Sequence, residues 1–285
     1  MAVFAVCTMD IKELLIRAKD SKQLDITSMG FTELPYLPDN LVYLRCSGNQ
    51  LSSLPPLPST LKHLFCNQNR LLSLPDLPDG LETLLCCYNF LCELPDLPPS
   101  LRRLECVSNR LTKLPPLPAL YKLWCDANQL VALPDLPLTL DNFGFDNNFV
   151  TVLPALPEGL RYLWCNNNRL RALPPIPSTL KKLSCSGNQL SNIPILPDEI
   201  ELKHNGNPWS KEFATFLGRE PVCQSILEYW LTFDDMRDRL RSLLTLRAIA
   251  RVIPLVEDTL CLVGEKLSNQ RGTLDNQIDS LYRWK

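Results

Sequence analysis

Cysteine is the residue of this chain whose number and spacing could do chemistry, because thiolates bind zinc and iron and pair as disulfides. Seven of the 12 cysteines recur at one position of a repeating segment, namely Cys46, Cys66, Cys86, Cys106, Cys125, Cys165 and Cys185. Stacked segments would place these thiols in a straight row, whereas a metal site needs converging ligands. Parallel Cα–Cβ vectors also suit disulfides poorly. We therefore predict buried free thiols that act as small apolar side chains, with no metal and no other cofactor.

Other reactive groups are few. Cys87 is predicted to point outward beside Cys92, so a vicinal disulfide between Cys86 and Cys87 stays open as an alternative. The two histidines, His63 and His204, fall on distant repeats and offer little material for a Ser/His/Asp or Cys/His arrangement. No glycine-rich phosphate loop is present. The sequence predicts no catalytic residue and no enzymatic activity.

An asparagine sets the period of the chain. It recurs at steps of 19 or 20 residues, at Asn49, Asn69, Asn89, Asn109, Asn128, Asn148, Asn168, Asn188 and Asn207. A period this regular indicates a stacked solenoid. We expect each amide to pair with backbone groups of a turn, because buried backbone groups must be satisfied. The asparagines are therefore predicted to be polar core residues.

The frame around each asparagine is Leu-x-x-Leu-x-Cys-x-x-Asn-x-Leu, as at Leu61, Leu64, Cys66, Asn69 and Leu71, followed by Leu-Pro-x-Leu-Pro. About nine such units cover residues 34 to 208, and the pattern resembles leucine-rich repeats. The short unit and the doubled Leu-Pro are similar to the bacterial-type class found in type III-secreted effectors and in proteins of large DNA viruses.

Effectors of that class often carry a carboxy-terminal ubiquitin-ligase domain with a catalytic Cys-x-Asp motif. The tail of this chain is too short for that domain, and neither Cys223 nor Cys261 stands in the motif. The resemblance therefore implies a protein-interaction scaffold without the ligase domain. An effector or adaptor linked to ubiquitin transfer through the helical tail is the alternative.

Three regions are predicted around these repeats. Residues 1–33 form a helical amino-terminal cap and a degenerate first repeat, with Met29 at the asparagine position. Residues 34–208 form the leucine-rich-repeat solenoid, with short parallel β-strands on the concave face and an extended, polyproline-like convex side. Residues 209–285 form an all-α carboxy-terminal cap or small domain, whose Leu240, Leu243 and Leu244 could support self-association.

Composition narrows the choice of partner and compartment. The net charge of -2 and the pI near 5.8 argue against nucleic acid and anionic membranes as partners. No stretch approaches the roughly 20 apolar residues that span a bilayer. The amino terminus lacks a signal-peptide pattern, and no Asn-x-Ser/Thr sequon occurs. We expect an intracellular, reducing location, which would be the host cytoplasm if a pathogen delivers the protein.

The candidate binding site follows from the frame. Residues four and six before each asparagine should face outward on the concave side, and Trp, Tyr and Arg are common interface anchors. The predicted partner-binding residues are Tyr43, Arg45, Phe65, Leu85, Arg103, Lys122, Trp124, Tyr162, Trp164 and Lys182. Tyr88 is expected in the same apolar stripe, and Gly144 is expected to leave a notch between the two tryptophans. The alternative is that these aromatic rings stack along the sheet and only stabilise it.

Overall fold

The computed structural model describes residues 11–191, 196–197 and 200–208, all within one structural unit. The predicted carboxy-terminal helices, the leucines proposed for self-association and both tail cysteines lie outside the described residues. Within the described part, no helix is long and apolar enough to cross a membrane.

One helix, α1 (Ile11–Ser21), precedes the repeats and confirms the predicted cap. Its buried face carries Ala18, with Leu14 and Leu15 half-buried beside it. The chain leaves the helix through Lys22, which has a positive φ of 60°. The backbone N–H of Lys22 donates to the carbonyl of Ala18 at 2.8 Å. This turn delivers the chain directly into the first strand.

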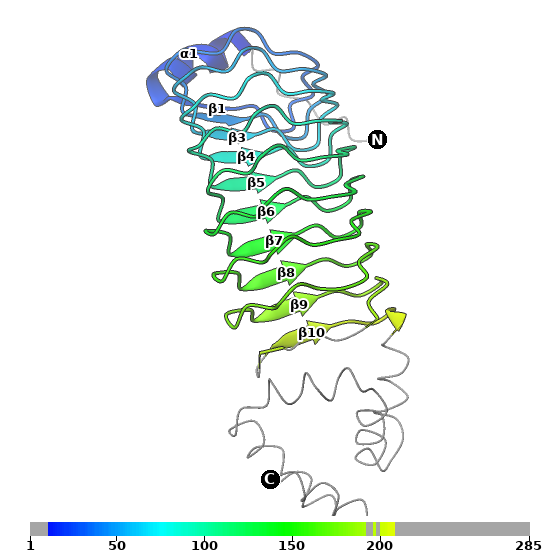
Figure 1. The fold of residues 1–285 in the computed structure, drawn as a ribbon. Coiled ribbons are helices and arrows are strands. Elements are labelled where there is room, and N and C mark those ends of the chain that lie inside the picture. Colours follow the sequence, from blue (N-terminus) through cyan, green and yellow to red (C-terminus); the bar gives the residue numbers. More distant parts are fainter. Residues whose placement is uncertain (1–10, 192–195, 198–199, 209–285) are drawn as a thin grey trace, which may run out of the picture. The chain divides into compact units, whose positions relative to one another are not determined.

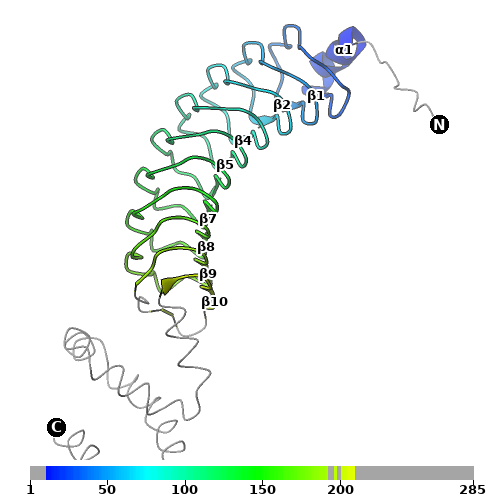
Figure 2. The same ribbon diagram turned by 90° about the vertical axis from the view of Figure 1, so that its right-hand side faces the viewer.

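Ten three-residue strands form one parallel sheet whose spatial order follows the sequence (Figure 1). Their bounds are β1 Gln23–Asp25, β2 Tyr43–Arg45, β3 His63–Phe65, β4 Thr83–Leu85, β5 Arg103–Glu105, β6 Lys122–Trp124, β7 Asn142–Gly144, β8 Tyr162–Trp164, β9 Lys182–Ser184 and β10 Glu201–Lys203. Figure 2 shows the coils of this unit stacked on one another, with all strands on the side toward which the stack bends. Equivalent residues of neighbouring coils pair in register, for example Leu44 with Leu64.

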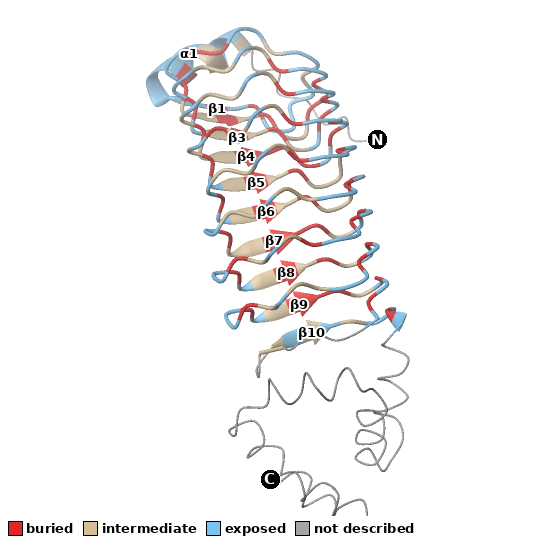
Figure 3. Ribbon diagram, in the orientation of Figure 1, coloured by how far each residue is buried: buried red, intermediate tan, exposed pale blue. Residues whose placement is uncertain are grey.

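Alternation along each strand separates core from surface. The central leucine of each strand points inward, and the cysteine that follows the strand joins it, so Leu64 and Cys66 are both fully buried. The flanking residues of the strands are mostly half-buried on the opposite face (Figure 3). The predicted core frame is confirmed.

The asparagines hold the coils together in the way the sequence predicts. The side-chain Nδ2 of Asn69 donates to the Cys46 carbonyl of the preceding coil at 2.9 Å and faces the Cys66 carbonyl of its own coil at 3.2 Å. Its Oδ1 accepts the backbone N–H of Leu51 at 3.0 Å. The other eight asparagines repeat this pattern, and we name the column the asparagine ladder. All nine are buried except Asn109, which is half-buried.

The ladder begins at Asn49. Met29 occupies the asparagine position of the first coil, but its side chain is 38% exposed and supplies no amide. Asn49 compensates by reaching back, since its Nδ2 donates to the Ile26 carbonyl at 2.8 Å and its Oδ1 accepts the N–H of Phe31 at 2.9 Å. The first repeat is therefore degenerate, as predicted, and the Asn49 side chain of the second repeat supplies its hydrogen bonds.

The return limbs contain no helix or strand within the described residues, in agreement with the predicted extended convex side. The expectation that both leucines of Leu-Pro-x-Leu-Pro face the core is only half correct. Leu54 and Leu74 are buried, whereas Leu57 and Leu77 are half-buried. In the limb before β2 the order is reversed, because Leu37 is buried and Leu34 is half-buried.

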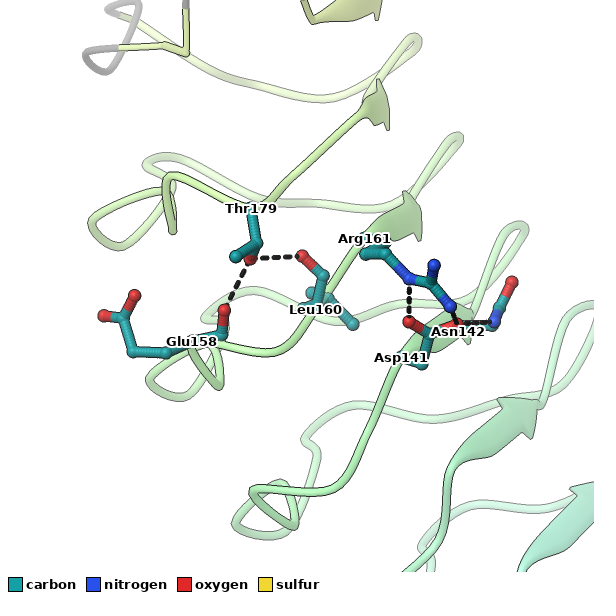
Figure 4. A network of polar contacts seen from close by, with 6 residues as sticks. All are labelled: Asp141, Asn142, Glu158, Leu160, Arg161 and Thr179. Atoms are coloured by element: carbon teal, nitrogen blue, oxygen red, sulfur yellow. Dashed lines mark hydrogen bonds and ion pairs between the residues drawn. The ribbon is translucent and has the colours of Figure 1, made fainter.

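Polar side chains join successive coils at the end of the return limb, as Figure 4 shows for three consecutive coils. The hydroxyl of Thr179 lies within hydrogen-bond distance of the Glu158 carbonyl at 2.5 Å and the Leu160 carbonyl at 3.0 Å, and it can share its proton between them. The Arg161 guanidinium pairs with the Asp141 carboxylate of the preceding coil (Figure 4). These contacts link neighbouring coils just before β8 and β9.

Two irregular coils keep the sheet in register. In the coil shortened at Ala119, the N–H of Leu120 donates to the Pro118 carbonyl at 2.6 Å, whereas other coils close this turn from the proline three residues back. Phe143 in β7 and Phe145 just after it replace the usual leucine and cysteine, and both rings are fully buried with centroids 4.9 Å apart. Neither the missing residue nor the two larger side chains changes the pairing register of the neighbouring strands.

Candidate functional site

The ten predicted binding residues all lie on strands β2 to β9 and share the concave face. Parallel pairing in register aligns the positions four and six before each asparagine into two columns along the sheet. Leu85 is buried and the other nine residues are half-buried. The predicted stripe is not continuous, however, because a group of paired charges divides it into two aromatic clusters.

The first aromatic cluster consists of Tyr43, Arg45, His63 and Phe65 on β2 and β3. The Tyr43 and His63 rings stack with centroids 4.4 Å apart, and His63 stacks on Phe65 at 6.5 Å. The Arg45 guanidinium lies over both flanking rings, 5.6 Å from the Tyr43 centroid and 5.4 Å from the Phe65 centroid. Burial lowers the pKa of His63 below its ordinary 6.5, which favours the neutral ring. His63 is absent from the predicted set, although its column position could have identified it.

Paired charges on β5 and β6 separate the clusters. The Glu105 carboxylate accepts hydrogen bonds from Arg103 Nε at 2.9 Å and Arg103 Nη2 at 2.7 Å, and Lys122 Nζ lies 3.1 Å away. Glu105 shares a column with Phe65 and Trp124, so position alone could have found it. Arg103 and Lys122, two of the predicted binding residues, are therefore already paired with a carboxylate of the protein itself. Lys182 is similarly paired with Glu201 at 2.7 Å.

The second aromatic cluster consists of Lys122, Trp124, Tyr162 and Trp164. The two indoles lie 4.8 Å apart between ring centroids, and Tyr162 stacks on Trp164 at 5.9 Å. Lys122 Nζ lies 5.4 Å from the Trp124 ring centroid. The indole Nε1 of Trp124 is buried without an acceptor, alone among the buried side-chain nitrogen and oxygen atoms of the described residues.

The predicted notch at Gly144 is wrong. The Trp124 ring lies over this glycine, and a Cβ added there would come within 2.9 Å of Trp124 Cε3. The absence of a side chain on the intervening coil lets the two indoles meet across it. Alternation along β7 explains the role of Gly144, because Phe143 and Phe145 point inward while Gly144 faces the concave side.

Tyr88 does not belong to the concave face. It precedes ladder residue Asn89 in a turn with a positive φ of 56° and lies outside every strand. The residue before each later asparagine of the ladder shares this left-handed conformation. The turn, rather than the strand, therefore directs the Tyr88 side chain.

A row of polar side chains two residues before the asparagines was not predicted. The Asp126 carboxylate accepts the N–H of Asp146 at 2.6 Å, and Asp146 accepts the N–H and Nδ2 of Asn166 at 2.6 and 2.8 Å. Burial raises the pKa of Asp126 to about 6 and also raises that of Asp146. These hydrogen bonds link neighbouring coils beside the second aromatic cluster.

The cysteine row consists of buried thiols. All nine described cysteines are free thiols, and burial raises the pKa of Cys66, Cys86 and Cys125 well above the ordinary value. The Cys66 thiol lies 3.5 Å from the Leu85 carbonyl of the next strand, as a weak hydrogen-bond donor would. Among the described residues, no group of histidine, cysteine, aspartate or glutamate side chains is arranged to hold a metal ion.

The predicted outward thiol is wrong. Cys87 is buried, and desolvation raises its pKa to about 11, because this position lies under the turn that carries the asparagine rather than on the strand. It forms no vicinal disulfide with Cys86. Cys92 on the return limb is exposed, as expected.

Comparison with known proteins identifies the repeat. A leucine-rich-repeat family model matches residues 40–61, and no curated protein sequence matches the chain. YopM from Yersinia enterocolitica WA-314 is similar, with a TM-score of 0.60, 35% identity, and coverage of 68% of this chain and 49% of that chain. This chain therefore spans about half the length of that YopM.

Two further solved structures are similar at lower levels. YopM from Yersinia pestis, described as a leucine-rich effector protein, gives 26% identity, a TM-score of 0.42 and coverage of 68% and 81% of the two chains. The functional domain of InlJ from Listeria monocytogenes, described as including a cysteine ladder, gives 22% identity, a TM-score of 0.55 and coverage of 65% and 48%.

The InlJ likeness concerns the fold alone. The matched repeat, the ten-stranded parallel sheet and the likeness to the Yersinia enterocolitica protein agree with the periodic asparagine ladder. The chain is a leucine-rich-repeat solenoid protein.

Proposed function

We propose that this protein is a non-enzymatic interaction scaffold whose concave face binds a partner protein through the two aromatic clusters. The observation that carries the proposal is the variety of the concave columns. The fold uses the same leucine, cysteine and asparagine in nearly every coil, but the outward columns place aromatic and charged side chains in only some coils. Side chains that the repeat does not require are available for recognition.

Pre-ordered rings suit such a role. The stacking within each cluster holds large aromatic side chains in place, so binding would order few additional rotamers. The indole Nε1 of Trp124 would gain a hydrogen bond from a partner that brought a carbonyl oxygen to it. The stacking that could merely stabilise the sheet also prepares it for contact.

The likeness to YopM and the state of the cysteines support a proposal about where the protein acts. We infer an effector-like protein that acts inside a cell, in a reducing compartment, because its similarity to YopM accompanies nine free cysteines. We retain residues 1–33 as cap, 34–208 as solenoid and 209–285 as a helical cap or small domain. The ubiquitin-linked alternative depends on Cys223 and Cys261, and no contact of the described residues favours it.

Site-specific photo-cross-linking tests the concave face. A benzophenone amino acid placed at Phe65 or Tyr162 should form discrete cross-linked products in cells that naturally contain the protein. The matched positions Tyr36 and Leu138 are 84% and 85% exposed on return limbs and should form few such products. Equal amounts of product from both pairs of positions would contradict the assigned face. In a second test the probe stays at Tyr162 and Phe65 is changed to Glu, and loss of the cross-linked product would support the assigned face.

A further inference from the structure

A second column of side chains runs along the edge of the solenoid, directly after the asparagine ladder. We name it the edge column, and it consists of Gln50, Arg70, Phe90, Arg110, Gln129, Phe149, Arg169 and Gln189. Every member is exposed. The backbone N–H of each donates to a carbonyl of the preceding coil, for example Arg110 to Leu91 at 2.8 Å and Phe149 to Leu130 at 2.8 Å. The column is therefore held in register by the backbone.

Two Phe–Arg pairs stand in this column at equivalent places. The Arg110 guanidinium lies 4.8 Å from the Phe90 ring centroid, and the Arg169 guanidinium lies 4.6 Å from the Phe149 centroid. The phenylalanines remain 40% and 41% exposed. A guanidinium stacked by its face keeps its N–H groups free at its edge, where they can bind a carboxylate through two hydrogen bonds.

The charge of this edge is one-sided. The exposed ionisable side chains of the edge column and of the third and fourth positions after the asparagines are five cations and one acid, namely Arg70, Arg110, Lys113, Arg169, Arg171 and Glu93. Within the described part of the chain, none of the five cations pairs with a carboxylate. Exposed Leu72, Val131 and Val152 lie at the same positions of other coils. A row of cations without carboxylate partners attracts negatively charged groups, and the apolar side chains beside it offer contacts to apolar residues.

We propose that the edge column is a docking site for an extended acidic segment of a partner protein. Carboxylates of the segment would pair with Arg110 and Arg169, and apolar side chains would lie against Phe90 and Phe149. Three coils separate the two pairs, which at ~4.8 Å per strand is roughly 14 Å. An extended segment rising ~3.4 Å per residue covers that distance in about four residues. Apolar residues about four apart, with acids between them, fit this spacing.

The observations favour an acidic peptide over single-stranded nucleic acid. Bases stack on open ring faces, but an arginine already covers one face of each phenylalanine. The chain also carries a net charge of -2. Its Leu-Pro-x-Leu-Pro segments, each taken with the residue that follows, contain no lysine or arginine and seven acids, namely Asp39, Asp76, Asp79, Asp96, Asp135, Glu158 and Asp198. A long polyanion would meet repulsion beyond the edge, whereas a short acidic segment would not.

Fluorescence anisotropy with a labelled peptide tests the proposal on the full chain. The probe is a peptide of about twelve residues, long enough at ~3.4 Å per residue to reach both Phe–Arg pairs, with two leucines about four apart among aspartates and glutamates. The charge-reversed variant Arg110→Glu/Arg169→Glu should bind it at least about tenfold more weakly than the wild type. Arg110→Lys/Arg169→Lys, which keeps the charge but not the planar stacking, should fall between them.

The matched control is Lys19→Glu/Lys181→Glu, which makes the same change in net charge at exposed positions away from the edge column. It should bind the peptide within about twofold of the wild type. Equal weakening by the control, or no binding of the peptide by the wild type, would overturn the proposal. A labelled single-stranded oligonucleotide that bound more tightly than the peptide, and lost affinity in the Arg110→Glu/Arg169→Glu variant, would replace it with a nucleic-acid site. Circular dichroism of every variant distinguishes lost binding from lost folding.

Discussion

The asparagine ladder and the concave columns run side by side along the same nine strands, β2 to β10, yet the ladder is uniform and the columns are varied. Every ladder position from Asn49 to Asn207 holds the same residue and makes nearly the same hydrogen bonds. The concave columns hold a different residue in almost every coil, from Tyr43 through Glu105 to Gly144. From β2 to β9 both are partly or fully withdrawn from water. A position that holds the same residue in every coil is therefore one that the stacking of coils requires. A position that varies from coil to coil is one that the stacking does not specify.

The largest effect should separate two asparagines of one coil. Asn148→Ala leaves the carbonyls of Cys125 and Phe145 and the N–H of Leu130 without their side-chain partner inside the core. We expect a loss of about 3 kcal/mol in the free energy of unfolding, measured by urea denaturation. Asn142→Ala, six residues earlier on the concave face, should cost well under half as much. Similar losses at the two sites would erase the distinction between ladder and concave columns.

A second change tests the contact between the two indoles of the second aromatic cluster. Gly144→Ala places a methyl group against the Trp124 ring, which must move away from Trp164. We expect a loss of about 1 to 2 kcal/mol and a shift in tryptophan fluorescence. Gly159→Ala is the control, because its nearest neighbour would be the Leu138 carbonyl at an ordinary 3.6 Å. An unchanged emission spectrum for Gly144→Ala would show that the rings tolerate the methyl group.

The third prediction concerns pH. Burial raises the pKa of Asp126 from 3.8 to about 6, so the native state holds the proton more tightly than the unfolded chain. The contribution of this group to stability is therefore present below pH 4 and is lost as the pH rises to about 6. Asp126→Asn keeps an acceptor for the Asp146 N–H but carries no charge, and it should stabilise the protein by about 1 kcal/mol at pH 7, a value reduced for partial exposure. Melting at pH 4 should show little difference, and a gain there as large as at pH 7 would point to packing instead.

The smallest effect on stability belongs to the cysteines. Of the nine that are described, Cys92 should react first with a thiol reagent in the native protein, while Cys87 and the buried row should react only on unfolding. Peptide mapping by mass spectrometry after brief labelling identifies the modified residues. Cys92→Ser should leave the melting temperature unchanged. Rapid labelling of Cys87 would show that its turn opens more readily than its burial indicates.

The periodic features could be predicted from sequence because each is repeated about nine times. Position within the repeat identifies the strands, the inward leucines and cysteines, and the bonding role of Asn69. The details of the site could not be predicted in this way. The Trp124 ring occupies the space over Gly144, and Glu105 neutralises Arg103, because side chains of neighbouring coils reach across columns. Such contacts depend on rotamers, which the spacing of residues does not specify.

Errors at Cys87 and Tyr88 share another cause. Both follow β4, where the chain leaves the strand and turns through a left-handed residue, so the in-and-out alternation of the strand no longer applies. The Asp126 row was missed for the same reason, since it lies in this turn. Treating the three residues before each asparagine as a turn would have corrected all three assignments.

The backward reach of each ladder amide has a consequence for how such a chain can change its length. Asn69 bonds to Cys46 and Leu51 of the coil before it, and the coils before and after the shortened one at Leu120 still pair in register. Removing or duplicating one whole coil would therefore restore the same bonds between the new neighbours. Recombination at any asparagine could therefore add or remove one coil. Each such event would bring new side chains together on the concave face and leave the fold unchanged.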